Sequence, residues 1–242
     1  MGAQPVCEFL DWDSKFFGRR IARANVSCLT EELVREIDAW CRVQRIDCLY
    51  FLASSSDRQT ARLARDSLFL FVDARMTLNL RIDGTRAQSS APARVRDACE
   101  DDIPALREIA RTSHRDSRFY YDENFPVGMC DKLYETWIEK SCRGWANRVL
   151  IAEEDNIVIA YLTCDLKKSG GAQIGLFGVA EKSRSRGIGK DLVSTAISWL
   201  AKQGAENVSV VTQGRNVRAQ QFYQRCGFTT QSVELWFHRW FQ

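Results

Sequence analysis

The chain has 242 residues, of which 45% are hydrophobic, 27% charged and 11% aromatic, a globular composition that excludes disordered and collagen-like proteins. Its 34 basic and 31 acidic residues give a net charge of +3, which is too small to indicate a nucleic-acid-binding protein. No run of about 18 apolar residues is present, so the sequence predicts no membrane span.

Strands and helices alternate in the first third of the chain, which predicts a small α/β domain over residues 1–82. Thr30 is a suitable cap for a helix that carries Ile37 and Cys41 on one apolar stripe. Between the first two strands we expect a turn at residues 11–14. The expected elements are strands at 6–10 and 20–26, a helix at 30–44, a strand at 48–52, a helix at 58–66 and a strand at 70–81.

Residues 83–93 are small and polar, and we predict that they form a linker to a second domain over residues 94–242. The alternative is a long surface loop within one domain. The second domain is expected to contain helices at 101–112, 127–141, 187–202 and 216–226, and strands at 148–153, 157–166, 173–179, 207–211 and 231–238. We expect the aromatic end, residues 236–241, to form an edge strand over the core or a contact with a second copy.

The nine cysteines are scattered, with no C-x-x-C pair, and the two histidines are His114 and His238. This spacing predicts neither a metal site nor a disulfide framework. No secretory signal is visible in residues 1–7. We therefore expect a protein of the reducing cytoplasm, in which the cysteines are small buried hydrophobic residues.

A basic turn with two glycines, Gly187 and Gly189, joins the predicted strand at 173–179 to the next helix. The first N–H groups of a helix have no partner within it, and with the helix dipole they attract an anion such as a diphosphate. The glycines allow a ligand to approach the backbone, and Arg184, Arg186 and Lys190 add positive charge. The same residues also fit a tight strand-to-helix junction that binds nothing.

A second segment, residues 216–228, predicts a short helix that ends at a glycine before the chain returns to a strand. Phe222 is expected in the core, and Tyr223 either shares that role or presents its hydroxyl to a ligand.

Together the two segments resemble the GCN5-related N-acetyltransferase (GNAT) superfamily over roughly residues 94–238. Residues 184–189 match its acyl-CoA motif R/Q-x-x-G-x-G/A, and residues 216–228 match N-x-x-A-x-x-x-Y-x-x-x-G-F. The resemblance implies an α/β (α+β) GNAT fold, a mixed and mostly antiparallel sheet flanked by helices, preceded by a smaller N-terminal α/β domain. It also implies acetyl-CoA as the acyl donor.

The resemblance further implies that the strand before the basic turn bulges away from its neighbour and frees N–H groups for pantetheine and the acetyl carbonyl. Tyr223 would protonate the departing thiolate as general acid. His114, Asp122, Glu123 and Asp165 are candidates for the general base, and water is an alternative. The residues implied in coenzyme binding are Phe177, Gly178, Val179, Arg184, Ser185, Arg186, Gly187, Ile188, Gly189, Lys190, Asn216 and Ala219.

The opening L-x-W-D-S-x-F-F-G at residues 10–18 resembles the dTDP-fucosamine acetyltransferase-like group of the superfamily. The loop at residues 113–126 is expected to form a substrate wall, with Phe119 and Tyr121 as flat faces and Arg118 or Arg115 for a diphosphate. A packed aromatic loop without a ligand is the alternative.

We therefore expect an acetyl-CoA-dependent N-acetyltransferase whose acceptor is the amino group of a dTDP-linked amino deoxysugar, attacking the thioester directly. The alternatives are an acetyltransferase for another small amine or a protein N-terminus, and a non-catalytic acyl-CoA-binding module. We expect neither nucleic acid nor membrane as a partner.

Overall fold

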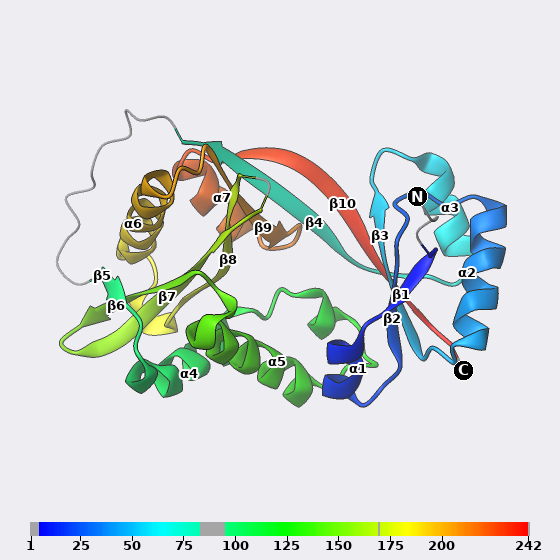
Figure 1. The fold of residues 1–242 in the computed structure, drawn as a ribbon, viewed down its shortest axis with the longest axis horizontal. Helices are drawn as coiled ribbons and strands as arrows, with labels where there is room; N and C mark the ends of the chain where they lie inside the picture. The colour runs from blue at the N-terminus through cyan, green and yellow to red at the C-terminus, as the bar shows by residue number, and fades with distance from the viewer. Residues whose placement is uncertain (1–4, 83–94, 169, 242) are drawn as a thin grey trace.

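The computed structural model describes residues 5–82, 95–168 and 170–241. Within this part of the chain, ten strands form one continuous mixed sheet in the order β1-β2-β3-β10-β4-β9-β8-β7-β6-β5. Two long strands, β4 (Leu70–Arg81) and β10 (Thr229–Trp240), cross between the two halves of the molecule (Figure 1). The predicted fold, a mixed and mostly antiparallel sheet flanked by helices, is confirmed.

The N-terminal half follows the predicted order of elements, with one correction. A helix rather than a turn follows the first strand, because Trp12 and Phe16 lie one helical turn apart and stack with their ring centroids 5.0 Å apart. Gly18 ends this helix in the left-handed conformation, at φ 64°. Thr30 caps the next helix as expected. The elements are β1 (Cys7–Phe9), α1 (Asp11–Phe17), β2 (Ile21–Ala24), α2 (Glu31–Val43), β3 (Cys48–Ser54), α3 (Arg58–Asp66) and β4.

The C-terminal half contains the predicted elements and one more strand, β5 (Val95–Asp97), which is too short and polar to show periodicity in the sequence. The helices are α4 (Ile103–Ser113), α5 (Val127–Lys140), α6 (Ile188–Lys202) and α7 (Val217–Arg225). The strands are β6 (Arg148–Glu154), β7 (Ile157–Leu166), β8 (Ala172–Val179), β9 (Asn207–Gln213) and β10. Short helical turns are η1 (Glu100–Asp102), η2 (Arg118–Tyr121), η3 (Ser141–Trp145) and η4 (Glu181–Ser183).

The expectation that the aromatic C-terminal strand lies at an edge is wrong. β10 pairs with β3 on one side and with β4 on the other. Its aromatic side chains alternate between the two faces, so Trp236 and Trp240 enter one core while Phe237 enters another. A strand of this composition is stabilised best where both of its faces and both of its edges are covered.

Each face of the sheet is covered by helices (Figure 1). Helices α6 and α7 pack over the C-terminal half of one face, and α2 and α3 pack over the N-terminal half of the same face. Helices α1, α4 and α5 cover the opposite face with a single core that includes β3, β6, β7 and β10. The division into domains 1–82 and 94–242 remains a prediction, and the predicted linker 83–93 lies outside the described residues.

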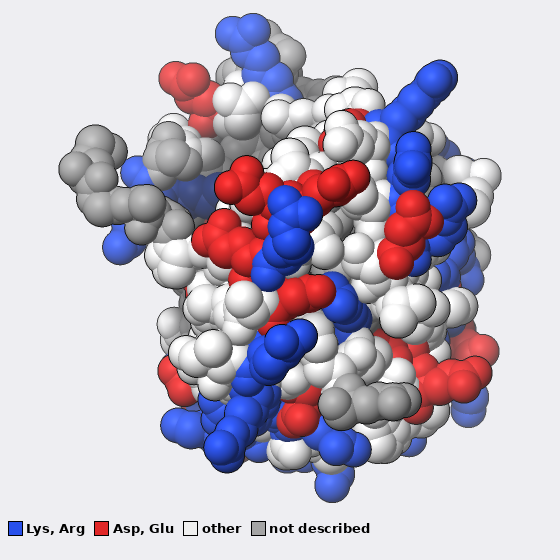
Figure 2. Space-filling view, turned by 90° about the vertical axis from the view of Figure 1, so that its right-hand side faces the viewer, with Lys and Arg blue, Asp and Glu red and all other residues white. Residues whose placement is uncertain are grey.

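None of the helices in the described ranges has both the length and the apolar character needed to cross a membrane. The face of the N-terminal half shown in Figure 2 carries Lys and Arg side chains interspersed with Asp and Glu. This face therefore carries no extended patch of one charge.

Candidate active site

The strand β8 contains a bulge where the sheet begins to open. Leu162 of β7 lies opposite Phe177, but two residues further along β7, Cys164 lies opposite Ile174. One extra residue of β8 is accommodated between these pairs, and the Leu176 N–H donates to Thr163 Oγ1 at 2.8 Å. A bulge of this kind disrupts the ladder locally and turns the strand away from its neighbour.

Beyond the bulge β8 separates from β9, with which it pairs in parallel only at residues 172–174. The Ala180 N–H donates to Ile159 O at 2.8 Å, so by the alternation of an antiparallel ladder the polar groups of Gly178 face β7. The N–H groups of Phe177 and Val179 therefore face the opening. The Val179 carbonyl also points away from β7, and it accepts from Arg184 Nε at 3.1 Å. The predicted bulge and separation are thus both present.

The basic turn leads directly into the N-terminus of α6. Gly187 adopts φ 86°, and a Cβ built there would contact nothing within 4 Å, so the backbone conformation is what requires glycine. Gly189 is different: a Cβ there would lie 2.9 Å from Phe177 Cζ and 3.1 Å from Phe222 Cζ. Its lack of a side chain serves the packing of α6 against β8 and α7, whereas we expected it to allow a ligand to approach.

The two arginines of the turn already have partners within the protein. Arg184 donates to the opened strand, and Arg186 forms two hydrogen bonds to Glu154 at 2.6 and 2.8 Å. Ser185, at φ 67°, accepts from Arg218 Nη2 at 3.0 Å. These contacts fix the shape of the turn, and the first N–H groups of α6 are the groups of the turn that could hold an anion.

Tyr223 is brought to the opened edge of β8 by aromatic packing. Phe222 stacks on Phe177 with the ring centroids 5.4 Å apart, and the Tyr223 ring lies 6.3 Å from that of Phe177. Tyr223 is 4% exposed, and burial raises the pKa of its hydroxyl well above the ordinary value. The hydroxyl therefore keeps its proton at neutral pH, as a general acid must.

Asn216 and Ala219 stabilise the start of α7. The Asn216 Oδ1 accepts from the Ala219 N–H at 3.0 Å, which caps the helix. The predicted contact of Asn216 with the coenzyme remains a prediction, and it would use the Nδ2 group.

On the opposite face of the sheet, Tyr161 and His114 lie against the opened strand. A Cβ at Gly178 would lie 2.6 Å from the Tyr161 ring and 3.1 Å from Ser113 Oγ, so glycine is needed for this approach. The Tyr161 hydroxyl lies 2.8 Å from His114 Nε2. Loss of solvent lowers the pKa of His114 to about 4, so its ring is neutral at pH 7.

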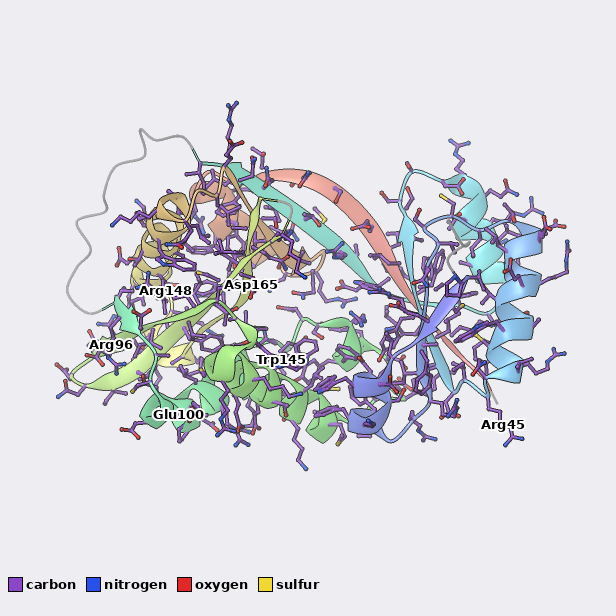
Figure 3. All side chains as sticks on the ribbon, viewed as in Figure 1. Arg45, Arg96, Glu100, Trp145, Arg148 and Asp165 are labelled. Atoms are coloured by element: carbon purple, nitrogen blue, oxygen red, sulfur yellow. The ribbon has the colours of Figure 1, made fainter. Side chains whose placement is uncertain are left out.

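The other three base candidates lie elsewhere. Asp122 accepts from His238, Trp240 and Asn124. Asp165, labelled in Figure 3, lies opposite Gln173, on the side of the bulge where β8 and β9 are still paired. Glu123 is exposed. The Asp165 carboxylate lies 3.0 Å from where a Cβ of Gly175 would be, at the start of the bulge, whereas His114 lies beside Tyr161 and Gly178, further along the opened strand.

Asp73 of β4 is a further carboxylate that the sequence analysis missed. Arg75 lies beside Gln213 and the Gly214 N–H donates to Ala74 O, so Asp73 lies where β9 gives way to the loop before α7, beside Arg215. Asp73 pairs with Trp236 and therefore lies on the same face as Tyr161. A carboxylate alone in a strand gives no sequence signal, because its position depends on the register of two other strands.

The environment of Asp73 is unusual for an aspartate. The residue is 4% exposed, and its Oδ1 has no hydrogen-bond partner in the part of the chain that the structure describes. Burial raises its pKa to about 6, and the nearby Arg215 opposes that shift. The Arg215 Nη1 lies 3.4 Å from the Oδ1, while its Nη2 donates to Val72 O at 2.6 Å and its guanidinium lies 3.5 Å from the Tyr121 ring centroid.

The loop at residues 113–126 divides into core and surface. Phe119 is 1% exposed and packs against Phe17 and Phe125, so it is a core residue and not the substrate contact we expected. Tyr121 is 50% exposed and Arg118 is partly exposed. Arg118 and Tyr121 remain the loop's candidates for binding an acceptor.

A separate hollow lies on the outer surface of α4 and α5, away from this site. Its charged side chains pair with one another: Arg107 binds Glu135 and Glu139, and Arg143 binds Glu139. These pairs satisfy the charges that a ligand would use, so we assign the hollow no function.

Comparisons with known proteins agree with this geometry. The sequence model of the Acetyltransferase (GNAT) family matches residues 103–228, just over half of the chain. The chain is 26% identical to a dTDP-fucosamine acetyltransferase of Escherichia coli O6:H1, over 99% of this chain and 100% of that protein. It is 27% identical to the spore coat polysaccharide biosynthesis protein SpsD of Bacillus subtilis, over 57% of this chain and 48% of that protein.

Among solved structures, a GCN5-related N-acetyltransferase from Sphaerobacter thermophilus shares the fold with a TM-score of 0.67 at 14% sequence identity. The similarity covers 97% of this chain and 76% of that chain. The N-terminal half is therefore part of the shared fold as well.

Proposed function

The chain belongs to the acetyltransferase (GNAT) family and is an N-acetyltransferase, and from this premise we propose that it transfers the acetyl group of acetyl-CoA to the amino group of a dTDP-linked amino deoxysugar. The observation that carries the proposal is the opened edge of β8. There the N–H groups of Phe177 and Val179 have lost their partner strand, and the Tyr223 ring lies 6.3 Å from the Phe177 ring.

Acetyl-CoA fits this edge for physical reasons. Pantetheine contains two amide groups and can pair with the free edge of β8 as an added strand does. The diphosphate would then lie at the N-terminus of α6, where the turn at residues 184–187 leaves N–H groups available. The N–H of Phe177 or Val179 would donate to the acetyl carbonyl and stabilise the negative charge that develops on its oxygen.

The acceptor would approach from the face that carries Tyr161 and Asp73. Its amine nitrogen forms a bond to the acetyl carbon, and the carbon–sulfur bond breaks. Tyr223 gives its proton to the departing thiolate, and the proton lost by the amine passes to Asp73, directly or through water. With its pKa near 6, Asp73 is ionised at pH 7 and basic enough to take part in this transfer.

The choice of a sugar nucleotide rests on two kinds of support. The full-length relative is named a dTDP-fucosamine acetyltransferase, and a second relative is named for polysaccharide biosynthesis. The half-exposed Tyr121 ring, backed by the Arg215 guanidinium, offers a flat surface for a base or a sugar.

The test is release of free CoA thiol from acetyl-CoA in the presence of a panel of amines. The panel contains dTDP-4-amino-sugars, the corresponding free amino sugars, simple amines and short peptides with a free N-terminus. We expect the highest kcat/KM with an amino-sugar nucleotide. Preference for a peptide would favour protein N-terminal acetylation, and binding of acetyl-CoA without turnover on any amine would favour a non-catalytic role.

A further inference from the structure

Arg118 is held in a fixed place between the two halves of the molecule. Its guanidinium carbon lies 4.2 Å from the ring centroid of Trp236 and 4.8 Å from that of Tyr50. These rings belong to β10 and β3, whereas Arg118 belongs to the turn η2 before α5. An arginine stacked on aromatic faces keeps its charge and loses little of its hydrogen-bonding capacity.

The orientation of Arg118 is set by a chain of buried hydrogen bonds. Its Nε donates to His238 Nε2 at 3.1 Å, and His238 Nδ1 lies 2.7 Å from Asp122 Oδ2. The side chains of His238 and Asp122 are both fully buried. An arginine can only donate, so Nε2 of His238 is the acceptor and Nδ1 carries the proton that is donated to Asp122. Burial lowers the pKa of His238 to about 4, which agrees with a neutral ring.

The hydrogen bonds from Arg118 through His238 to Asp122 use only the Nε of Arg118. In the described ranges, no carboxylate or carbonyl accepts from its Nη1 or Nη2. The neighbouring arginines differ in this respect, because Arg115 pairs with Asp131 at 3.2 Å and Arg215 donates to two carbonyls. Arg118 therefore differs from Arg115 and Arg215: the protein fixes the orientation of its guanidinium, and its Nη1 and Nη2 groups can still donate to a ligand.

Two buried polar atoms in this region make no hydrogen bond within the described residues, although one of them, Asp73 Oδ1, lies 3.4 Å from Arg215 Nη1. The Tyr50 Oη, whose ring stacks on Arg118, is buried without a hydrogen bond, as is Asp73 Oδ1. Tyr50 is 1% exposed and Asp73 is 4% exposed. Asp73 pairs with Trp236, whose ring stacks on Arg118, so its carboxylate lies in the same region of the sheet. A buried hydroxyl without a hydrogen bond is costly, and one that lies beside a cation with unpaired Nη groups indicates a site for a polar ligand.

We propose that the Nη groups of Arg118 bind a phosphate of the acceptor, and that Asp122 and His238 are positioning residues that hold the guanidinium for it. The inference rests on the proposed function, since a nucleotide-linked sugar carries a diphosphate at a fixed distance from its amine. The planar fork of arginine matches two phosphate oxygens. Because the fork is held before the ligand arrives, binding costs little side-chain entropy.

The direct test measures binding of dTDP by calorimetry to protein saturated with CoA, so that the coenzyme's own diphosphate site is filled. Arg118→Gln is expected to weaken dTDP binding about 10- to 100-fold, the range that follows from losing charge-assisted hydrogen bonds. Arg115→Gln is the matched control and should change it less than about twofold, because its partner is Asp131. Equal affinities in wild type and Arg118→Gln would overturn the proposal.

The positioning role is tested by His238→Gln and Asp122→Asn. Both variants should raise KM for the amino-sugar nucleotide several-fold. For a phosphate-free amino sugar, both kcat and KM should stay unchanged. A purely structural role would alter both acceptors alike, and that result would contradict the assignment. If these variants fold poorly in a thermal melt, Arg118→Lys supplies the answer: it keeps the charge but loses the fork and the bond to His238, and retention of wild-type affinity for dTDP would also contradict it.

The two proposals fail in different ways. If dTDP binding depends on Arg118 but no amine is acetylated, the proposed function is overturned and the assignment of the phosphate site to Arg118 still stands. Acetyl transfer to an amino-sugar nucleotide with dTDP binding that ignores Arg118 would overturn the phosphate site alone.

Discussion

The two sides of the opening in the sheet are built by different means. The side assigned to the coenzyme consists of backbone groups of one stretch, from the edge of β8 to the start of α6, with Tyr223 close behind. The side assigned to the acceptor consists of side chains from β4, η2, the loop before α7 and β10, which meet only in the folded protein. Backbone groups are enough to bind a coenzyme that does not change. Selecting one acceptor among many requires side chains of particular shape and charge.

The largest effect is expected from Tyr223→Phe, which removes the proton donor and keeps the ring. We expect kcat to fall by up to ~1,000-fold, the range of general acid catalysis, with the dissociation constant of acetyl-CoA nearly unchanged. Single-turnover thiol release and calorimetry measure the two quantities. Tyr120→Phe, which removes a hydroxyl bonded to Asp131, is the control. Unchanged turnover would remove Tyr223 from its role.

Asp73→Asn tests the acceptor side. We expect a loss of about 100-fold in kcat/KM at pH 7, because the variant cannot accept the proton. The raised pKa means that the carboxylate of the wild type is protonated, and inactive as a base, below about pH 6. The wild-type profile should therefore fall on the acid side of pH 6, and the variant's should be flat there. An acid limb that persists in Asp73→Asn would assign the base elsewhere, with His114 as the first candidate.

Gly187→Val tests the backbone origin of the coenzyme site. A side chain at φ 86° strains the turn and projects into the space where the diphosphate is proposed. We expect acetyl-CoA to bind at least about tenfold more weakly, or by about 1.4 kcal/mol. Gly204→Val is a matched control, since Gly204 has φ 82° and equally open space at the other end of α6. Equal effects of the two variants on acetyl-CoA binding would mean that only strain is being measured.

The smallest effect is expected from Arg186→Gln. Its exposed pair with Glu154 should contribute only about 0.2–1 kcal/mol to fixing the turn. Acetyl-CoA affinity should then change less than about fivefold, with Glu154→Gln giving the same change and the double variant no more than either. If Arg186 binds the diphosphate directly, Glu154→Gln will leave the affinity unchanged or increase it while Arg186→Gln weakens it strongly.

These two sides also differ in how far the sequence predicts them. The helices with clear stripes and caps, such as the one capped by Thr30, were predicted almost to the residue, because their signals are local. The basic turn was found because it lies within one short segment, and the opening of the strand before it was implied by the resemblance that this segment carries. The helix α1 was missed because aromatic contacts with α5, such as Trp12 with Trp137, support it.

The acceptor side was predicted only in part: the local composition of the loop at 113–126 pointed to Arg118 and Tyr121, but the residues that other strands bring to them were missed. Asp73 is placed beside Arg215 by the register of β4 with β9. His238 meets Asp122 across 116 positions of the chain. The central place of β10 likewise depends on two partner strands that its own sequence does not encode. Long-range pairing places these residues, and no local pattern reports it.

The most direct measurement is a crystal structure of the protein with acetyl-CoA bound. We expect the diphosphate at the N-terminus of α6, the acetyl oxygen within hydrogen-bonding distance of the N–H of Phe177 or Val179, and the sulfur beside the Tyr223 hydroxyl. A coenzyme bound elsewhere, or a Tyr223 hydroxyl directed away from the sulfur, would contradict this expectation.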